Sequence, residues 1–303
     1  MMAFKPEKYL AALKVKPSTK VSLKKFHTNY YIKGISNVDA RKLLHEGIIK
    51  LAKVHDKLYA DNQYSVLIVL QGMDAAGKDS IVKHVMTGLN PQGVGVTSFK
   101  VPTSTELDHD YLWRHYLALP PRGEIGIFNR SHYENVLVTK VHPDFILNEK
   151  LPGIHAVKDI KPGFWKVRYK EINRFEKTLV ENGTVILKFF LHISKEVQKK
   201  RFIERIDDPA KNWKFSLGDI KERERWDDYQ DAYEKMLSNT STSYAPWFVI
   251  PADDKGIARI FVAELIYEQF EKLEISYPKL NEEQKNALIK ARQLLMSAIE
   301  HVN

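Results

Sequence analysis

Residues 64–81 read Tyr-Ser-Val-Leu-Ile-Val-Leu-Gln-Gly-Met-Asp-Ala-Ala-Gly-Lys-Asp-Ser-Ile. The apolar run Val66–Leu70 predicts a buried strand, and a helical pattern begins at Ser80. Between them, Gly72 and Gly77 let the backbone curl so that its N–H groups point inward, and the new helix presents its positive end to an anion. This strand–loop–helix context predicts a phosphate-binding loop.

The loop departs from the usual sequence of such loops at two positions. Lys78 supplies a cation for terminal phosphates, but Asp79 follows it where a Ser or Thr normally holds Mg²⁺, and Ser80 comes one position late. Asp74 lies inside the loop, where its charge would repel phosphates unless a divalent cation lay between them. Because Mg²⁺ takes oxygen ligands and usually only one or two carboxylates, Asp74 is predicted to be a metal ligand. A helix-capping Asp is the alternative. The predicted phosphate-binding positions of the loop are Gly72, Ala75, Ala76, Gly77, Lys78, Asp79 and Ser80.

Composition narrows the class of protein. The 303 residues are 44% hydrophobic and 28% charged, which is ordinary for a globular chain with one large core. The chain has no Cys, so disulfides, thiolate metal sites and thiol nucleophiles are excluded. No apolar run at the start is long enough for a signal peptide or a membrane span, which predicts a cytoplasmic protein without a membrane partner.

The net charge of +9 indicates a polyanionic partner. Nucleic acid is disfavoured, because the basic residues are spread along the chain without a dense block or an RNA-binding aromatic signature. A phosphate-rich small substrate or polymer fits this charge equally well.

Strands and helices are predicted to alternate, which favours an α/β fold with a parallel sheet covered on both faces. The further predicted strands are Thr97–Val101, Ile125–Phe128, Val185–Ile193 and Trp247–Ile250. The predicted helices are 39–60, Asp108–Ala118, Val167–Glu181, Lys195–Ile206 and Gly256–Leu273. Residues 1–36 are predicted to be a basic surface arm, 37–303 a single phosphate-loop domain, and 142–166 an irregular insertion. The amphipathic end, 282–302, is predicted to pack on the body or on a partner subunit.

A second chemical element follows the predicted strand Ile125–Phe128. In a phosphate-loop protein the end of a neighbouring strand faces the same crevice. Asn129 stands where a carboxylate would be expected; its amide can orient a metal-bound water but supplies no charge, so Asp74 must contribute more. Arg130 can clamp phosphate oxygens in bidentate fashion, although an Arg after a strand is also a common structural ion-pair residue.

The third element is the charged segment 195–226. Arg201 and Arg205 lie four residues apart, so they share one helix face, and an anion between them would offset their mutual repulsion. Asp207-Asp208-Pro209 ends this helix. Lys211, Lys214 and Asp219 follow. After a phosphate loop, the segment resembles the mobile lid of nucleotide kinases; a solvated pair of charged helices is the alternative. The eleven His are scattered without metal-ligand spacing, and His132 is interpreted as structural.

Four segments together resemble polyphosphate kinase family 2 over about residues 40–270. They are 72–78 (GMDAAGK), 128–134 (FNRSHYE), 207–215 (DDPAKNWKF) and 244–253 (YAPWFVIPAD). The resemblance implies a thymidylate-kinase-like phosphate-loop fold with a parallel sheet and a helical lid at about 195–226. It also implies transfer of phosphoryl groups between inorganic polyphosphate and nucleotides (AMP, ADP and ATP) with Mg²⁺, or Mn²⁺ as an alternative ion.

The resemblance also implies roles for individual residues. It places catalysis on Asp74, Lys78 and Arg130, and polyphosphate binding on lid Arg and Lys residues that include Arg201 and Arg205. Of the other lid residues, Lys211 and Lys214 are predicted to bind phosphate as well. Nucleotide contacts are predicted for Asn129, Glu134 and Asp219. Many family members carry Asp at the position of Asn129. That Asn, and Glu134 where many ADP-specific members have Asn, resemble the subgroup that phosphorylates both AMP and ADP.

The physical reading agrees with direct in-line transfer. A terminal nucleotide phosphate is already anionic near neutral pH, so the obstacle is bringing two polyanions together, and positioning with charge neutralisation should dominate. Two rivals remain: an ATP-consuming nucleoside-monophosphate kinase and a non-catalytic polyanion-binding protein. Aromatic-rich surface helices are compatible with a homo-oligomer.

Overall fold

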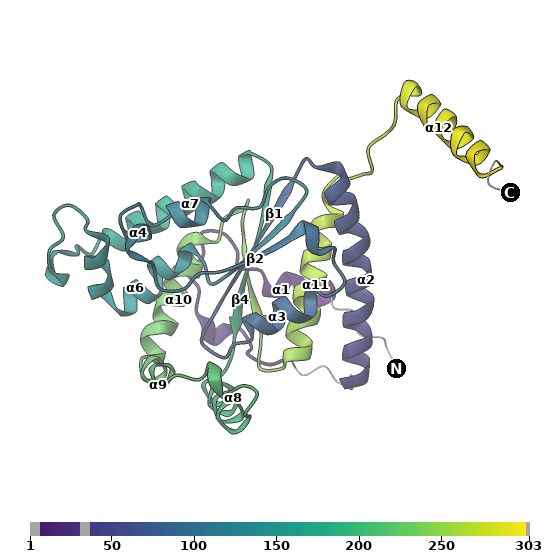
Figure 1. The fold of residues 1–303 in the computed structure, drawn as a ribbon. Helices are drawn as coiled ribbons and strands as arrows, with labels where there is room; N and C mark the ends of the chain where they lie inside the picture. The colour runs from purple at the N-terminus through teal and green to yellow at the C-terminus, as the bar shows by residue number, and fades with distance from the viewer. Residues whose placement is uncertain (1–6, 31–36, 301–303) are drawn as a thin grey trace.

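The computed structural model describes residues 7–30 and 37–300. Its centre is a five-stranded sheet in the order β2-β3-β1-β4-β5, in which every neighbouring pair is parallel (Figure 1). The strands are β1 (Ser65–Gly72), β2 (Val94–Ser98), β3 (Ile125–Asn129), β4 (Thr184–His192) and β5 (Trp247–Pro251). The predicted α/β fold with a parallel sheet is confirmed.

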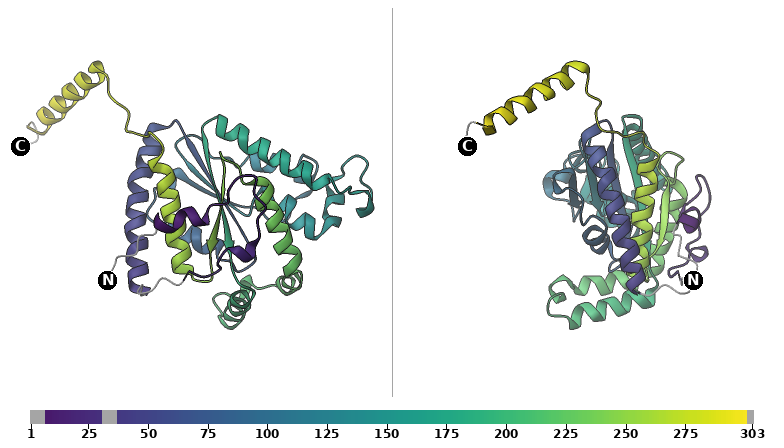
Figure 2. Two further views of the ribbon diagram at one scale, coloured as in Figure 1. Left: turned by 180° about the vertical axis from the view of Figure 1, so that it is seen from behind. Right: turned by 90° about the vertical axis from the view of Figure 1, so that its right-hand side faces the viewer.

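Helices cover both faces of the sheet, as Figures 1 and 2 show. On one face lie α2 (Asn37–Asp61), α3 (Lys78–Val85) and α11 (Lys255–Glu271), and on the other α7 (Phe164–Glu181) and α10 (Trp226–Thr240). The remaining α-helices are α1 (Glu7–Leu13), α4 (Ser104–Leu107), α5 (Trp113–Tyr116), α6 (Val138–Val141), α8 (Lys195–Asp207), α9 (Leu217–Glu224) and α12 (Glu282–Glu300). Short 3₁₀ segments are η1 (Leu23–Lys25), η2 (Pro91–Gly93), η3 (His132–Val136), η4 (Pro143–Glu149), η5 (Val157–Asp159) and η6 (Asn212–Lys214).

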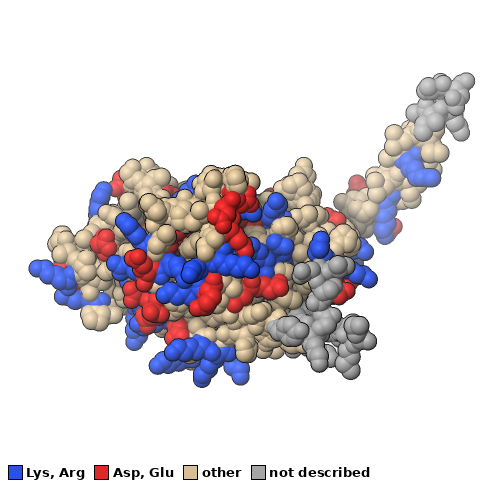
Figure 3. All heavy atoms as spheres, turned by 90° about the horizontal axis from the view of Figure 1, so that it is seen from below, with Lys and Arg blue, Asp and Glu red and all other residues tan. Residues whose placement is uncertain are grey.

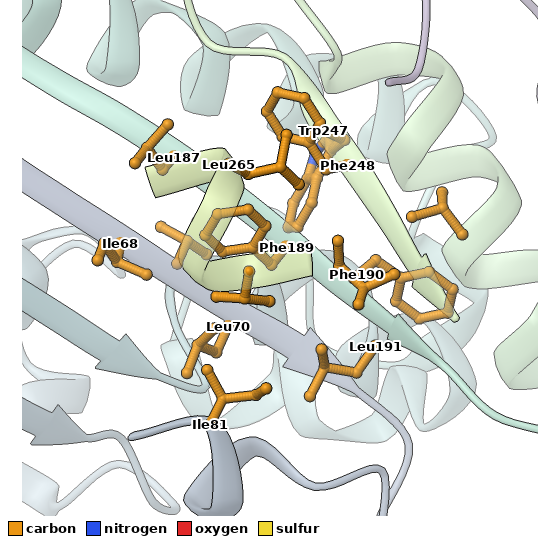
Figure 4. Close-up of a cluster of buried hydrophobic side chains, with 14 of the residues drawn as sticks. Ile68, Leu70, Ile81, Leu187, Phe189, Phe190, Leu191, Trp247, Phe248 and Leu265 are labelled. Carbon is orange, nitrogen blue, oxygen red and sulfur yellow. The ribbon is translucent and has the colours of Figure 1, made fainter. Parts of the chain in front are cut away.

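The central strand β1 is apolar because both of its faces are buried. All eight of its residues are buried, and Ile68 and Leu70 lie among Leu187, Phe189 and other side chains of the core (Figure 4). Leu70 is in register with Asn129 of β3, so the segments that follow β1 and β3 leave the sheet side by side. This register places the two predicted chemical elements side by side at the carboxyl ends of β1 and β3.

Two local predictions were wrong. The strand expected at 97–101 lies at 94–98, and the single helix expected at 108–118 is replaced by the short helices α4 and α5. Helix α4 begins before the predicted helix because Thr103 and Glu106 form a capping box. A new helix, α5, begins after Asp110, whose carboxylate accepts a bond of 2.9 Å from Leu112 N–H. The irregular insertion predicted at 142–166 is confirmed as mainly loops and 3₁₀ turns.

The predicted surface location of the N-terminal arm is wrong for several of its described residues. Leu10, Leu13 and Val15 are buried, and Val15 N–H donates to the Trp247 carbonyl at 2.9 Å. The segment therefore covers the outer edge of β5, since an unpaired strand edge needs covering. Residues 1–6 and 31–36 of the predicted arm lie outside the described residues.

Helix α12 stands away from the body after an extended linker (Figures 1 and 2). The side chains of residues 282–297 are all exposed, Leu294 and Leu295 among them. Packing of this helix on the body is therefore the wrong alternative, and packing on a partner subunit stays a prediction. Over the described ranges, no helix combines the length and apolar character that crossing a bilayer requires.

Candidate active site

A large cavity of about 1180 Å³ opens at the carboxyl ends of β1 and β3. It is lined by the loop after β1, the end of β3, the lid helices and the segment after β2. All predicted site residues except Gly72 contribute to this lining: Asp74, Ala75, Ala76, Gly77, Lys78, Asp79, Ser80, Asn129, Arg130, Glu134, Arg201, Arg205, Lys211, Lys214 and Asp219. Three segments that lie far apart in the sequence therefore meet at one place.

The loop after β1 has the backbone that phosphate binding requires. Gly77 has φ 111° and precedes the first residue of α3, which begins at Lys78, two residues before the predicted start. A Cβ at Gly72 would lie 2.8 Å from the Leu191 carbonyl oxygen, so only glycine fits there. The glycines thus let the loop pass close to β4 and turn into the start of α3, whose N-terminus faces the loop.

Lys78 lies at the base of the loop, with its ammonium folded back on the backbone. Its Nζ donates to the carbonyls of Gly72 at 2.6 Å and Met73 at 3.3 Å. Burial, followed by the positive charge of Arg130, lowers the pKa of Lys78 to about 8. A bound phosphate would give this amine an anionic partner.

Arg130 lies between two carboxylates. Its guanidinium is 2.6 Å from Asp74 and 3.4 Å from Glu134. The negative charge of Glu134 and then that of Asp74 raise the pKa of Arg130, although burial opposes them. The Arg130 backbone is left-handed, with φ 61°, a conformation that few non-glycine residues adopt.

Asp79 connects the end of β3 to the lid. Its carboxylate accepts a bond of 2.9 Å from Asn129 Nδ2 and one of 3.2 Å from Lys214 Nζ. Burial alone would raise the pKa of Asp79, but these two bonds hold it below the ordinary value. Next to this contact, Arg205 lies 3.4 Å from Asp219. The departure at Asp79 therefore places an ion pair between loop and lid.

Arg201 has other partners than those expected from the sequence. It is only 8% exposed, and its guanidinium donates to the carbonyls of Ala75 and Ala76, both at 3.0 Å. It also donates to Ala252 at 2.6 Å and Asp253 at 3.0 Å. These bonds hold the loop in place, while Arg201 also lines the cavity, and its role as a phosphate ligand stays a prediction. Helical spacing brought it to the right face but could not reveal these carbonyls.

The cavity continues past Arg130 to a second end that sequence reasoning missed. There it is lined by Phe99, Glu106, Tyr111, Arg114 and Glu149, from the segment after β2 and the 142–166 insertion. No periodic or motif signal in the sequence marks these residues. His132, by contrast, is fully buried with Nε2 at 3.3 Å from Glu176, as expected of a structural histidine.

The carboxylates in the part of the cavity beside the loop after β1 fit a hard divalent cation. Among the described residues, no three His, Asp or Glu side chains gather into a metal cage. Mg²⁺ needs only one or two carboxylates when phosphate oxygens complete its shell, and the half-buried Asp74 lines the cavity. Burial, then the negative charge of Asp74, raises the pKa of Asp219, so a second carboxylate shares this part of the cavity. A cation would relieve that repulsion.

The charge around the lid is mixed but rich in cations. Figure 3 views the molecule from the side of α8 and α9 and shows Lys and Arg gathered across this face, with acidic side chains among them. Of these cations, Arg205, Lys211 and Lys214 line the cavity. A polyanion entering here would meet several cations before it reached the loop.

Comparison with known proteins places the chain in a family. The family model for polyphosphate kinase 2 (PPK2) matches residues 34–278. The chain is 49% identical over 255 residues to an ADP-polyphosphate phosphotransferase of Rhodopseudomonas palustris, covering 84% of this chain and 87% of that protein. It is 47% identical over 231 residues to an AMP/ADP-polyphosphate phosphotransferase of Meiothermus ruber, covering 76% and 80%.

A solved structure agrees with these matches. The crystal structure of polyphosphate kinase 2 from Arthrobacter aurescens TC1 superposes with a TM-score of 0.82 at 38% identity, covering 96% of this chain and 98% of that one. The similarity therefore extends over the sheet, the phosphate loop and the lid. This chain belongs to the polyphosphate kinase 2 family.

Proposed function

We propose that this protein transfers a terminal phosphoryl group, reversibly, from inorganic polyphosphate to AMP and to ADP, with Mg²⁺ (or Mn²⁺) as the metal. One observation carries the proposal: Lys78, Arg130 and Asp74 meet at one end of a single large cavity in a chain of this family. Cations with one metal-binding carboxylate are what phosphoryl transfer between two polyanions needs. The relatives named above are called polyphosphate phosphotransferases, which supports the same donor.

The chemistry follows from the positions of these groups. The loop amides and Lys78 hold donor phosphates, and Arg130 faces the group in transfer with its guanidinium fork. Mg²⁺ bound at Asp74 would add positive charge against the phosphate oxygens. The acceptor phosphate oxygen is already anionic, so no general base is required, and the transfer is direct and in line.

The size and lining of the cavity support two substrates at once. About 1180 Å³ exceeds the 300–1,000 Å³ of an ordinary small-ligand site. The donor lies toward the basic lid residues Arg205, Lys211 and Lys214. The acceptor lies toward Asn129, Glu134 and Asp219, with the aromatic and polar far end beyond Arg130 open to its nucleoside. AMP acceptance is the part of this proposal that rests on Glu134.

An assay of AMP or ADP with polyphosphate and Mg²⁺, run with and without ATP, tests the proposal. Phosphorylation of the nucleotide without ATP supports it. Phosphorylation of AMP only when ATP is present would identify an ATP-dependent nucleoside-monophosphate kinase, and binding of polyphosphate without turnover would identify a binding protein. A cytoplasmic location, where nucleotides and Mg²⁺ are abundant, belongs to the same proposal.

A further inference from the structure

A buried polar cluster lies beneath the segment that carries Arg130. It consists of Tyr133 from η3, Glu176 from α7 and Lys188 from β4, and none of the three side chains is exposed. Lys188 Nζ donates to Glu176 Oε2 at 2.6 Å, to the Tyr133 hydroxyl at 2.9 Å and to the Thr240 carbonyl at 2.7 Å. The Tyr133 hydroxyl donates in turn to Glu176 Oε1 at 2.5 Å. All three donors of the ammonium are therefore used.

The cluster connects to Arg130 through two buried residues. Ser131, His132 and Tyr133 follow Arg130 directly and are fully buried. His132 Nε2 also lies 3.3 Å from Glu176 Oε1, and Ser131 Oγ accepts a bond of 3.0 Å from Gln71 Nε2 at the end of β1. A buried polar network thus fixes the chain on the carboxyl side of Arg130.

Arg130 needs such support because its backbone is strained. A left-handed φ of 61° persists in a non-glycine residue only when the surroundings over-determine it. On the amino side, Arg130 N–H donates to the Leu70 carbonyl at 3.2 Å, in continuation of the sheet. The cluster supplies the constraint on the other side.

Stability alone does not account for a charged pair at this depth. Replacement of buried ion pairs by well-packed apolar residues is often neutral or stabilising. Fixed hydrogen-bond geometry is what an ion pair offers and an apolar contact does not. We propose that Tyr133, Glu176 and Lys188 are positioning residues, which keep Arg130 in its left-handed conformation with its guanidinium at Asp74. This inference rests on the role proposed for Arg130.

The test begins with Tyr133→Phe, which removes one hydroxyl and keeps the ring. We expect kcat to fall on the order of tenfold with KM for both substrates within about twofold, since misplacement of a catalytic group by about 1 Å can cost 10²-fold. Tyr169→Phe is the matched control, because the Tyr169 hydroxyl is buried on α7 without a hydrogen-bond partner. Its kcat should stay within about twofold of the parent. All variants are assayed well below their unfolding temperatures.

A double-mutant cycle separates positioning from general damage. In an Arg130→Lys background, Tyr133→Phe should cost less than about twofold, because the group that it positions is already gone. An equal loss in both backgrounds would overturn the inference. If Arg130→Lys itself left kcat unchanged, the proposed role of Arg130 would fail instead, so the two failures are distinguishable.

If Tyr133→Phe unfolds, a variant that leaves no unpaired buried charge tests the inference in its place. The triple variant Tyr133→Phe/Glu176→Leu/Lys188→Met removes every charge of the cluster and leaves no buried ion unpaired. We expect it to fold with kcat lowered on the order of tenfold or more. A folded triple variant with unchanged kcat would show that the cluster serves stability alone.

Discussion

Arg130 and Asp74 lie 56 residues apart in the sequence, and their side chains form an ion pair of 2.6 Å at the cavity. The pair joins the loop after β1 to the end of β3. It also joins the two groups to which we assign opposite roles in the proposed function, a cation for phosphate oxygens and a carboxylate for a metal ion. Each group holds the other in place before substrates arrive, which reduces the reorganisation that binding requires.

Asp74→Asn should lower kcat by about 10²-fold and raise the Mg²⁺ concentration needed for half-maximal rate, because the variant loses the negative charge proposed to bind the metal. Asn129→Ala should have the smaller effect, since Asn129 brings no charge and contacts Asp79. A Mg²⁺ titration of both variants checks this. An unchanged titration for Asp74→Asn, or a larger defect at Asn129, would contradict the metal role.

The pH profile should reveal Lys78. Because burial lowers its pKa to about 8, the amine loses its proton in the free enzyme as pH rises through that value, and kcat/KM should decline above about pH 8. Lys78→Arg, if active, should carry this decline to higher pH, because a guanidinium stays charged. Lys83→Arg on the same helix is the control, since Lys83 is exposed and lies off the cavity lining. A decline that remains at pH 8 in Lys78→Arg would assign it to another group.

Arg201→Ala and Arg205→Ala should separate stability from binding. Arg201→Ala strips charge-assisted bonds from four carbonyls, two of them buried and two part-buried, and should lower the free energy of unfolding by about 3 kcal/mol or more. Arg205→Ala should leave the unfolding temperature nearly unchanged and raise KM for polyphosphate more than KM for AMP. Its effect should shrink as salt rises, because screening weakens the contact in the parent enzyme as well. Thermal unfolding with KM at two salt concentrations checks both, and a stable Arg201→Ala with only a KM defect would favour a phosphate ligand over a structural role for Arg201.

Glu134→Asn tests acceptor choice. Because Glu134 also holds Arg130 at 3.4 Å, some loss with both acceptors is expected. The informative quantity is the ratio of kcat/KM for AMP to that for ADP. Loss of one charge-assisted hydrogen bond, about 1.5–3 kcal/mol, should lower this ratio at least tenfold if Glu134 seats AMP. An unchanged ratio would move acceptor choice elsewhere, for instance to the far end of the cavity near Glu149.

The parts predictable from sequence were those with strong local patterns. The apolar run before Gly72 and the glycine spacing identified the loop, and the strand before Asn129 identified its neighbour, because parallel strands end at one edge. The α7 and α11 helices followed from long periodic segments, whose bounds the structure moves by only a few residues. Patterns of this kind depend on the segment itself.

The rest depended on distant partners. Nothing near Arg201 in the sequence reveals that its guanidinium meets carbonyls of the loop and of the segment after β5. The burial of Leu10 and Leu13 required knowledge of the open edge of β5. Lys188 does carry a signal in the sequence, because a lysine inside an apolar strand must find a buried counter-charge, which here is Glu176.

Direct phosphoryl transfer from polyphosphate to the nucleotide is tested most directly by a single turnover with ³²P-labelled polyphosphate. The mixture holds excess enzyme, AMP and Mg²⁺ without ATP, and the reaction is quenched in alkali to preserve any phosphorylated histidine. We expect label to pass into ADP while the protein stays unlabelled at every time point, and we expect Lys78→Ala to slow this transfer by about 10²–10³-fold. Label that appears on the protein before it appears in nucleotide would contradict direct transfer. A nucleotide that stays unlabelled unless ATP is supplied would contradict polyphosphate as the donor.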